Sequence, residues 1–202
     1  MRIGIDFDNT IVCYDDLFYE IALDAGIIPS SIGKSKYSVK EYLITNNFES
    51  LWTELQGKVY GDFMYKAIPY EGVLDFLGHP IFCDLDIFII SHRTQFPYLG
   101  KKTDLHISAK NWVKENNIFQ LSHLKPSQLF FETSVNDKLN RVRKQRCDIF
   151  IDDLSSFLLS KNFPIGVRRI LFDPKRKHHQ TESIEILHSW FDILKVIIDE
   201  TK

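Results

Sequence analysis

The sequence has few of the features that mark secreted, membrane-spanning or disulfide-rich proteins. Its three cysteines, Cys13, Cys83 and Cys147, show no paired or CxxC spacing, which favours a reducing compartment and buried thiols. No segment approaches the roughly 18 uninterrupted apolar residues of a membrane span. Asp6 and Asp8 lie where the apolar stretch of a signal peptide would fall. We therefore expect a cytoplasmic protein without a membrane partner.

An excess of positive charge is also absent. Lys plus Arg number 25 against 27 for Asp plus Glu, a formal net charge of -2. This balance argues against a protein that coats DNA or RNA. Internal repeats and low-complexity segments are missing too. With 202 residues, 44% hydrophobic and 26% charged, the chain fits one globular core domain that carries a small insertion.

Short apolar runs have the length of strands that are buried on both faces. They span residues 3–8, 86–91, 128–132, 148–153 and, more weakly, 168–173. Helical patterns lie between and after these runs, at residues 104–116, 135–146 and 183–198. Strands and helices that alternate at this spacing predict an α/β fold, a three-layer Rossmann-like core with a parallel sheet and helices on both faces.

The segment between the first two predicted strands breaks this alternation. Its patterns are helical, at residues 15–25, 39–46 and 48–61, with a Gly-, Pro- and Ser-containing loop at 26–38. We therefore predict a core domain of residues 1–13 and 67–202. A small helical module of residues 14–66 is predicted to be inserted into it after the first strand.

Polar residues follow the predicted strands, at the edge where open parallel sheets bind ligands. They are Asp6 and Asp8 on the first strand, Ser91 on the second, Glu132 on the third, and Asp152 and Asp153 on the fourth. Carboxylates that meet at one place repel one another, and Mg²⁺ is a natural counter-charge for such oxygen ligands. A single Asp is more often a helix or turn cap, but four at two strand ends beside a serine favour a metal site.

Three of these segments resemble motifs of the haloacid dehalogenase-like (HAD) phosphohydrolase superfamily. Residues 6–10, Asp-Phe-Asp-Asn-Thr, match its Asp-x-Asp-x-Thr signature. Residues 89–91, Ile-Ile-Ser, are similar to its second motif, and residues 150–153, Phe-Ile-Asp-Asp, to its fourth. The resemblance implies a HAD-like core, and it places the helical insertion where that superfamily carries a type-1 cap.

The resemblance also implies a mechanism, that of a phosphatase with an aspartyl-phosphate intermediate. Asp6 would be the nucleophile that attacks phosphorus. Asp8 would protonate the leaving oxygen and then activate the hydrolytic water. Mg²⁺ would be held by Asp6, the Asp8 backbone carbonyl and the acidic pair of the fourth motif. Either Asp152 or Asp153 could be the direct ligand of that pair.

The phosphate-binding residues implied by the resemblance are Ser91, Thr10 and a lysine from a third motif. Lys138 and Lys110 are the two candidates for that lysine, each on a predicted helix, although a helix lysine is usually solvated. His92 and Arg93 follow Ser91 and could contact the substrate or its leaving group, but a solvated loop is nearly as common at such a position.

The function that we expect is therefore Mg²⁺-dependent hydrolysis of a small phosphorylated metabolite, a sugar phosphate or (deoxy)nucleotide, with no nucleic-acid partner. Aromatic residues of the insertion could stack on a base or sugar, although most should pack the insertion's own core. A receiver-like signalling module is an alternative, but its third strand would end in Asp where this chain has Glu132. Within the superfamily, dehalogenases lack the second aspartate, so Asp8 favours a phosphatase or phosphotransferase.

Overall fold

The computed structural model describes residues 1–122, 124–179 and 183–201 of the chain. The chain forms two compact units, which we call the α/β unit and the helical unit. The α/β unit comprises Met1–Val12, Pro69–Arg93 and Asn117–Lys202, and the helical unit comprises Cys13–Ile68 and Thr94–Asn116.

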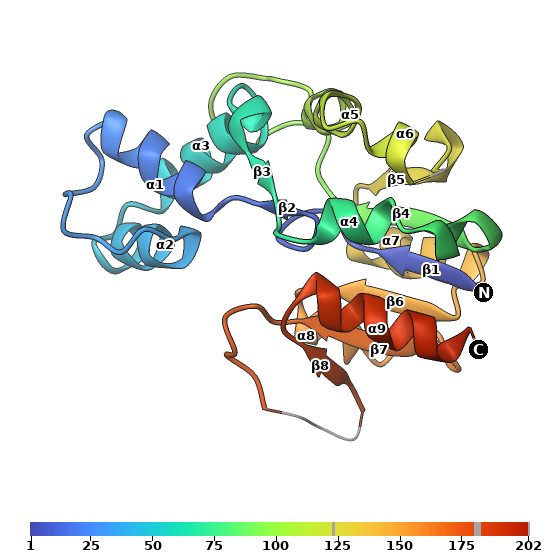
Figure 1. The fold of residues 1–202 in the computed structure, drawn as a ribbon. Coiled ribbons are helices and arrows are strands. Elements are labelled where there is room, and N and C mark those ends of the chain that lie inside the picture. The colour runs from blue at the N-terminus through green and yellow to red at the C-terminus, as the bar shows by residue number, and fades with distance from the viewer. Residues whose placement is uncertain (123, 180–182, 202) are drawn as a thin grey trace. The chain divides into compact units, whose positions relative to one another are not determined.

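A six-stranded parallel sheet forms the centre of the α/β unit (Figure 1). Its strands are β1 (Arg2–Ile5), β4 (Asp86–His92), β5 (Leu129–Glu132), β6 (Ile149–Asp152), β7 (Arg168–Phe172) and β8 (Glu185–Leu187). They lie in the order β5-β4-β1-β6-β7-β8, and each pairs in parallel with its neighbours. The order reverses next to β1, which is the position where sheets of this kind bind ligands. The predicted parallel α/β core is confirmed.

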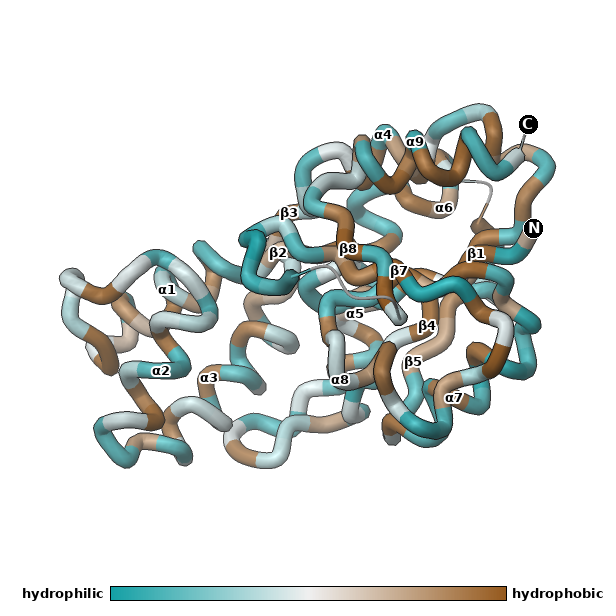
Figure 2. The backbone as a smooth tube through the Cα atoms, turned by 90° about the horizontal axis from the view of Figure 1, so that it is seen from below, coloured by the Kyte–Doolittle hydropathy of each residue, from teal (hydrophilic) through white to brown (hydrophobic). Residues whose placement is uncertain are grey.

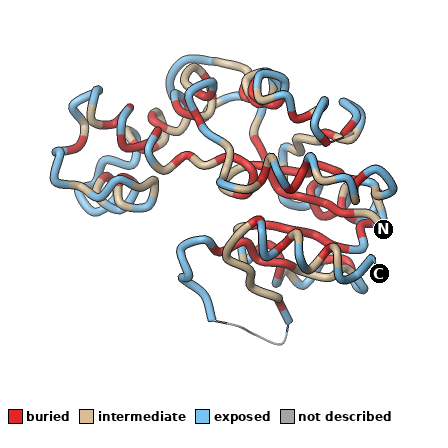
Figure 3. The backbone as a smooth tube through the Cα atoms, viewed as in Figure 1, coloured by how far each residue is buried: buried red, intermediate tan, exposed pale blue. Residues whose placement is uncertain are grey.

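Helices cover both faces of this sheet. Leu171 and Phe172 are neighbours on β7, so their side chains point to opposite faces. Leu171 joins a buried cluster that includes Leu139 of one helix, whereas Phe172 packs against the ring of Trp190 in another. The central strands β1, β4 and β6 are mostly hydrophobic (Figure 2) and mostly buried (Figure 3). The helical elements of the unit are α4 (Val73–Leu77), η2 (Pro80–Asp84), α6 (Ile118–Leu121), η3 (Pro126–Gln128), α7 (Val135–Lys144), α8 (Ser155–Leu158) and α9 (Trp190–Glu200).

A glycine lets two central strands carry a bulky aromatic core. Gly4 of β1 lies opposite Phe150 of β6, and a Cβ atom at Gly4 would be 2.5 Å from Cδ2 of that ring. The missing side chain therefore makes room for Phe150, which is fully buried. This packing sets the spacing of the two strands whose carboxyl ends carry the predicted acids.

The prediction of one helix over residues 183–198 is wrong in its first half. Glu185–Leu187 forms the edge strand β8, which is hydrogen-bonded in parallel to β7, and the helix α9 begins only at Trp190. Ser189 caps α9, because its side chain accepts a hydrogen bond from the backbone N–H of Asp192. Glu185–Leu187 form a strand because they pair with the free edge of β7, although their apolar spacing also fits a helix.

The helical unit contains the three helices predicted for the insertion. They are α1 (Asp15–Asp24), α2 (Lys36–Thr45) and α3 (Glu49–Tyr60), followed by η1 (Met64–Lys66); β2 (Val12–Cys13) and β3 (Ile68–Pro69) pair in a separate two-stranded sheet. Tyr14, Phe18, Trp52 and Tyr60 pack their rings together inside the unit, with neighbouring centroids 4.9 to 6.4 Å apart. These aromatic residues therefore form the unit's own core.

Helix α5 (Leu105–Glu115) and the loop before it also belong to the helical unit. The indole Nε1 of Trp112 donates to the Ala67 carbonyl at 2.8 Å, and Asp62 accepts hydrogen bonds from Lys101 and Thr103. The predicted boundaries place 94–116 in the core, so this grouping differs from them in that segment. None of the helices in the described parts of the chain has both the length and the apolar character of a membrane span.

Candidate active site

The predicted acids of the first and fourth motifs meet at the carboxyl edge of the sheet. Asp6 follows β1, and its backbone N–H donates to the Ile151 carbonyl of β6 at 2.9 Å. Asp152 is the last residue of β6. Because the two strands are parallel neighbours, both carboxylates lie at the same edge, and both side chains are buried.

Lys138, near the start of α7, joins these two acids. Its ammonium Nζ lies 2.6 Å from Oδ1 of Asp6 and 2.6 Å from Oδ2 of Asp152. All three side chains are at most 6% exposed, and the ring centroid of Phe157 lies 4.2 Å from the ammonium. The arrangement places a buried cation between two buried carboxylates, at the sheet edge where ligands bind.

Burial and charge shift the protonation equilibria of this cluster in opposite ways. Burial, together with the nearby carboxylates of Asp152 and Asp8, raises the pKa of Asp6 to about 7 against the opposing effect of Lys138. Burial alone lowers the pKa of Lys138, but the carboxylates of Asp152 and Asp6 outweigh it and hold the pKa above its ordinary value. Lys138 is therefore charged at neutral pH.

A third carboxylate completes a set of oxygen ligands. Oxygen atoms of Asp6, Asp152 and Asp153 all lie within 4.8 Å of one another. Asp152 accepts hydrogen bonds with both oxygens, from Lys138 and from the Leu154 backbone N–H at 2.8 Å. Asp153 is only half-buried. Clustered carboxylate oxygens fit a hard divalent cation such as Mg²⁺.

The loop after β1 carries Asp8 and Thr10 to the same edge. Thr10 is fully buried, and its hydroxyl lies 3.5 Å from Oδ2 of Asp6. Asp8 forms an ion pair with Arg93, whose side chain is only 3% exposed. Asn9 between them adopts a left-handed conformation with φ of 60°, which lets the loop turn back on itself.

The other predicted residues separate into buried and exposed positions. Ser91 is buried at the end of β4, whereas His92 is exposed. Lys110 is exposed on α5 in the helical unit, so of the two candidate lysines it is Lys138 that contacts the acids. The geometry thus assembles Asp6, Lys138 and Asp152 with Asp153, and pairs Asp8 with Arg93.

The sequence pattern does not predict the pairing of Arg93 with Asp8, because it indicates only that Arg93 and His92 follow Ser91. The alternation of side chains along the strand could have indicated that Arg93 is buried. Side chains of extended chain alternate, so Ser91 and Arg93 share one side and His92 takes the other. The buried, exposed, buried sequence of these three residues follows this alternation.

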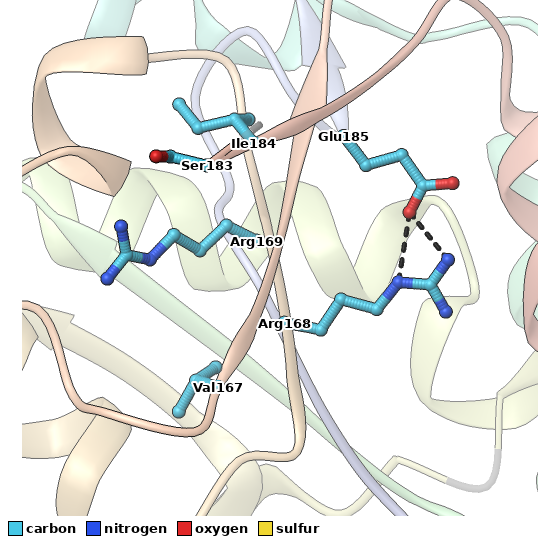
Figure 4. A pocket seen from close by; sticks show the side chains of 6 residues that line it. All are labelled: Val167, Arg168, Arg169, Ser183, Ile184 and Glu185. Atoms are coloured by element: carbon cyan, nitrogen blue, oxygen red, sulfur yellow. Dashed lines mark hydrogen bonds and ion pairs between the residues drawn. The ribbon is translucent and has the colours of Figure 1, made fainter. Parts of the chain in front are cut away.

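A separate surface pocket of about 450 Å³ lies where β7 and β8 begin (Figure 4). Its lining includes Arg168 and Glu185, which form an ion pair with 2.6 Å between Nη2 and Oε2. Arg168 begins β7, so the pocket is at the amino end of the strand, opposite to the edge that carries the acids. It contains none of the predicted site residues.

No family model matches the sequence, and no curated protein matches it at a significant level. Solved structures do match it, and the chain has the fold of HAD-superfamily hydrolases and phosphatases. The HAD-hydrolase YfnB from Bacillus subtilis, solved with magnesium, superposes with a TM-score of 0.60 at 13% identity, over 97% of each chain.

Two further structures show the same fold. A HAD family hydrolase from Deinococcus radiodurans R1, solved with phosphate and sodium, matches with a TM-score of 0.60 at 11% identity, over 99% of this chain and 96% of its own. A HAD phosphatase from Thermococcus onnurineus matches with a TM-score of 0.56 at 11% identity, over 97% of each chain. The similarity to these structures shows the fold of the chain.

Proposed function

We propose that this chain is a Mg²⁺-dependent phosphomonoesterase that acts on a small phosphorylated metabolite through an aspartyl-phosphate intermediate. The observation that carries the proposal is the bridge of Lys138 between Asp6 and Asp152, beside Asp153. A lysine and two carboxylates are rarely buried together at the ligand-binding edge of a sheet for a structural role alone. The fold shared with HAD hydrolases and phosphatases supports the same function.

Each residue of the site has a separate role in the first half-reaction. A carboxylate oxygen of Asp6 attacks phosphorus, and the bond between phosphorus and the leaving oxygen breaks. The proton of Asp8 passes to that leaving oxygen, which departs as an alcohol. Lys138 holds Asp6 in place and offsets the negative charge that gathers there. Buried Ser91 and Thr10 are placed to donate hydroxyl hydrogen bonds to phosphate oxygens.

The second half-reaction restores the enzyme. Asp8, now a carboxylate, takes a proton from water as the water oxygen attacks phosphorus. The bond between phosphorus and Asp6 then breaks and phosphate leaves. Mg²⁺ held by Asp6, the Asp8 backbone carbonyl and the acidic pair of Asp152 and Asp153 would neutralise phosphate charge. Oxygens of both members of the pair lie close to Asp6, so either could be the direct ligand.

The class of substrate rests on the helical insertion between the first two strands of the core. Such an insertion favours a small metabolite such as a sugar phosphate or nucleotide. This part of the proposal identifies a class of substrate, and a panel of phosphorylated metabolites would identify the members that the enzyme accepts.

The test measures phosphate release from p-nitrophenyl phosphate and from that panel, with Mg²⁺ and with a chelator. We expect turnover only with Mg²⁺, and none for Asp6→Asn with an unchanged circular dichroism spectrum. Asp75→Asn, at an exposed position of α4, is the matched control and should keep full activity. Full activity of Asp6→Asn, or of the wild type in chelator, would overturn the proposal.

A further inference from the structure

Arg93 is held from several directions at the carboxyl end of β4. Its backbone N–H donates to the Glu132 carbonyl at 2.8 Å, and its guanidinium lies 6.0 Å from the ring centroid of Phe7. Glu132 is itself held by Arg141, with 2.7 Å between Nε and Oε1. The guanidinium therefore has a fixed position and is not a mobile surface charge.

The charge of this buried guanidinium is matched by Asp8. Nη1 of Arg93 contacts Oδ1 of Asp8, and the Asp8 side chain is only 18% exposed. A buried arginine needs a partner because removal of its charge from water is unfavourable. The planar guanidinium also fixes the direction of a carboxylate more strictly than an ammonium does. The pair thus determines where the second Asp8 oxygen can point.

We propose that Arg93 is a positioning residue for leaving-group protonation, and that it acts through Asp8 rather than by contact with the substrate. This inference rests on the proposed phosphatase function. Oδ1 of Asp8 accepts the hydrogen bond from Arg93 in both charge states of the carboxyl group. Once Asp8 is protonated, Oδ2 carries the proton and passes it to the leaving oxygen as the phosphorus–oxygen bond breaks. The Asp8 carboxylate formed in that step stays paired with the guanidinium until it takes the proton of the hydrolytic water.

The effect of Arg93 then depends on the leaving group. A nitrophenolate ion is stable enough to depart without a proton, whereas the alkoxide of a sugar or of glycerol is not. The loss of a positioned general acid therefore lowers the rate mainly for substrates with poor leaving groups. Loss of a phosphate contact, or of the local fold, lowers the rates of all substrates together.

The experiment compares kcat/KM of wild type, Arg93→Met and Arg93→Lys on p-nitrophenyl phosphate, phenyl phosphate and glycerol 2-phosphate. We expect Arg93→Met to lose roughly 100-fold on glycerol 2-phosphate but less than about 10-fold on p-nitrophenyl phosphate. Arg93→Lys, which keeps the charge and loses the planar fork, should lie between them. An equal loss on all three substrates would overturn the inference.

A double variant supplies the second measurement. In an Asp8→Asn background, Arg93→Met should produce little further loss, because both changes remove one function. Full additivity of the two losses would mean that Arg93 acts without Asp8, and would contradict the inference. If Arg93→Met fails to fold, Arg93→Lys with and without Asp8→Asn gives the same test.

Arg168→Met is the matched control, because it removes an ion-paired arginine from the opposite end of the sheet. It should leave the dependence on the leaving group unchanged. Failure of the proposed function has a different signature: the wild type would release no phosphate from any of the three substrates, or Asp6→Asn would remain active. If turnover requires Asp6 but Arg93→Met lowers the rates of all three substrates equally, only the positioning role is overturned.

Discussion

The indole Nε1 of Trp190 donates a hydrogen bond to the backbone carbonyl of Thr10 across 3.2 Å. The two residues are 180 positions apart in the sequence, and both are fully buried. This contact joins the last helix to the loop that follows the first strand. Because that loop also carries Asp8, and the Thr10 hydroxyl reaches toward Asp6, the C-terminal helix supports the candidate active site.

Trp190→Phe tests this support. The ring can still pack against Phe76 and Phe172, but the buried Thr10 carbonyl loses its donor. We expect the free energy of unfolding to fall by about 1–3 kcal/mol, measured by urea denaturation, and phosphatase turnover to fall with it. Trp112→Phe, which removes an indole donor inside the helical unit, should lower stability by a similar amount. A Trp190→Phe protein with wild-type stability would contradict the supporting role.

Lys138→Met should be the most destabilising of the single changes in the cluster. Removal of the ammonium leaves Asp6 and Asp152 buried beside each other, and we expect a loss of about 3–5 kcal/mol in the free energy of unfolding together with loss of turnover. Adding Asp152→Asn to this variant should restore part of the stability, because it removes one of the facing charges. Lys110→Met is the control, since Lys110 is exposed, and it should unfold like the wild type.

Gly4→Ala tests the packing between β1 and β6. The added Cβ meets the Phe150 ring, which is fixed inside a buried cluster, so ring or strand must move. We expect a loss of about 1–3 kcal/mol in chemical denaturation. In a Phe150→Leu background the same substitution should be less destabilising, because the smaller side chain leaves space. An identical penalty in both backgrounds would show that the ring is not the obstacle.

Asp173, the buried residue that follows β7, should contribute stability that depends on pH. Burial alone raises its pKa, but hydrogen bonds from the backbone N–H groups of Lys177 and His178 and from the His178 side chain hold the pKa below its ordinary value. A depressed pKa stabilises the fold above the unfolded-state pKa, and this contribution is lost as the pH falls through the folded-state value.

Asp173→Asn should therefore lower the free energy of unfolding by about 1–3 kcal/mol at pH 7. The difference from wild type should shrink as the pH falls below about 4. Urea denaturation at a series of pH values measures it, with the exposed Asp75→Asn as the control that should match the wild type throughout. A penalty for Asp173→Asn that stays constant down to the lowest pH would rule out a charge-dependent origin.

The sheet and its acidic edge could be predicted because their signals are local. Apolar runs such as that of β4 are buried on both faces, and polar residues that end them must lie at the strand ends. The edge strand β8 could not be predicted, because its signal is not local. Its three residues have no long apolar run, and only the unpaired edge of β7 makes a strand of them.

Local patterns in the amino-acid sequence predict the parallel α/β core, the helical insertion and the candidate residues Asp6, Asp8 and Asp152. The fold is needed to show which lysine joins these acids and that Arg93 pairs with Asp8. Lys138 and Asp6 are 132 positions apart, and Arg93 and Asp8 are 85 apart. Local patterns cannot rank two helix lysines, because both follow a strand and both suit a solvated helix. Only the adjacency of β4, β1 and β6, and the packing of α7 against the sheet, bring these charges to one buried place where each requires the other.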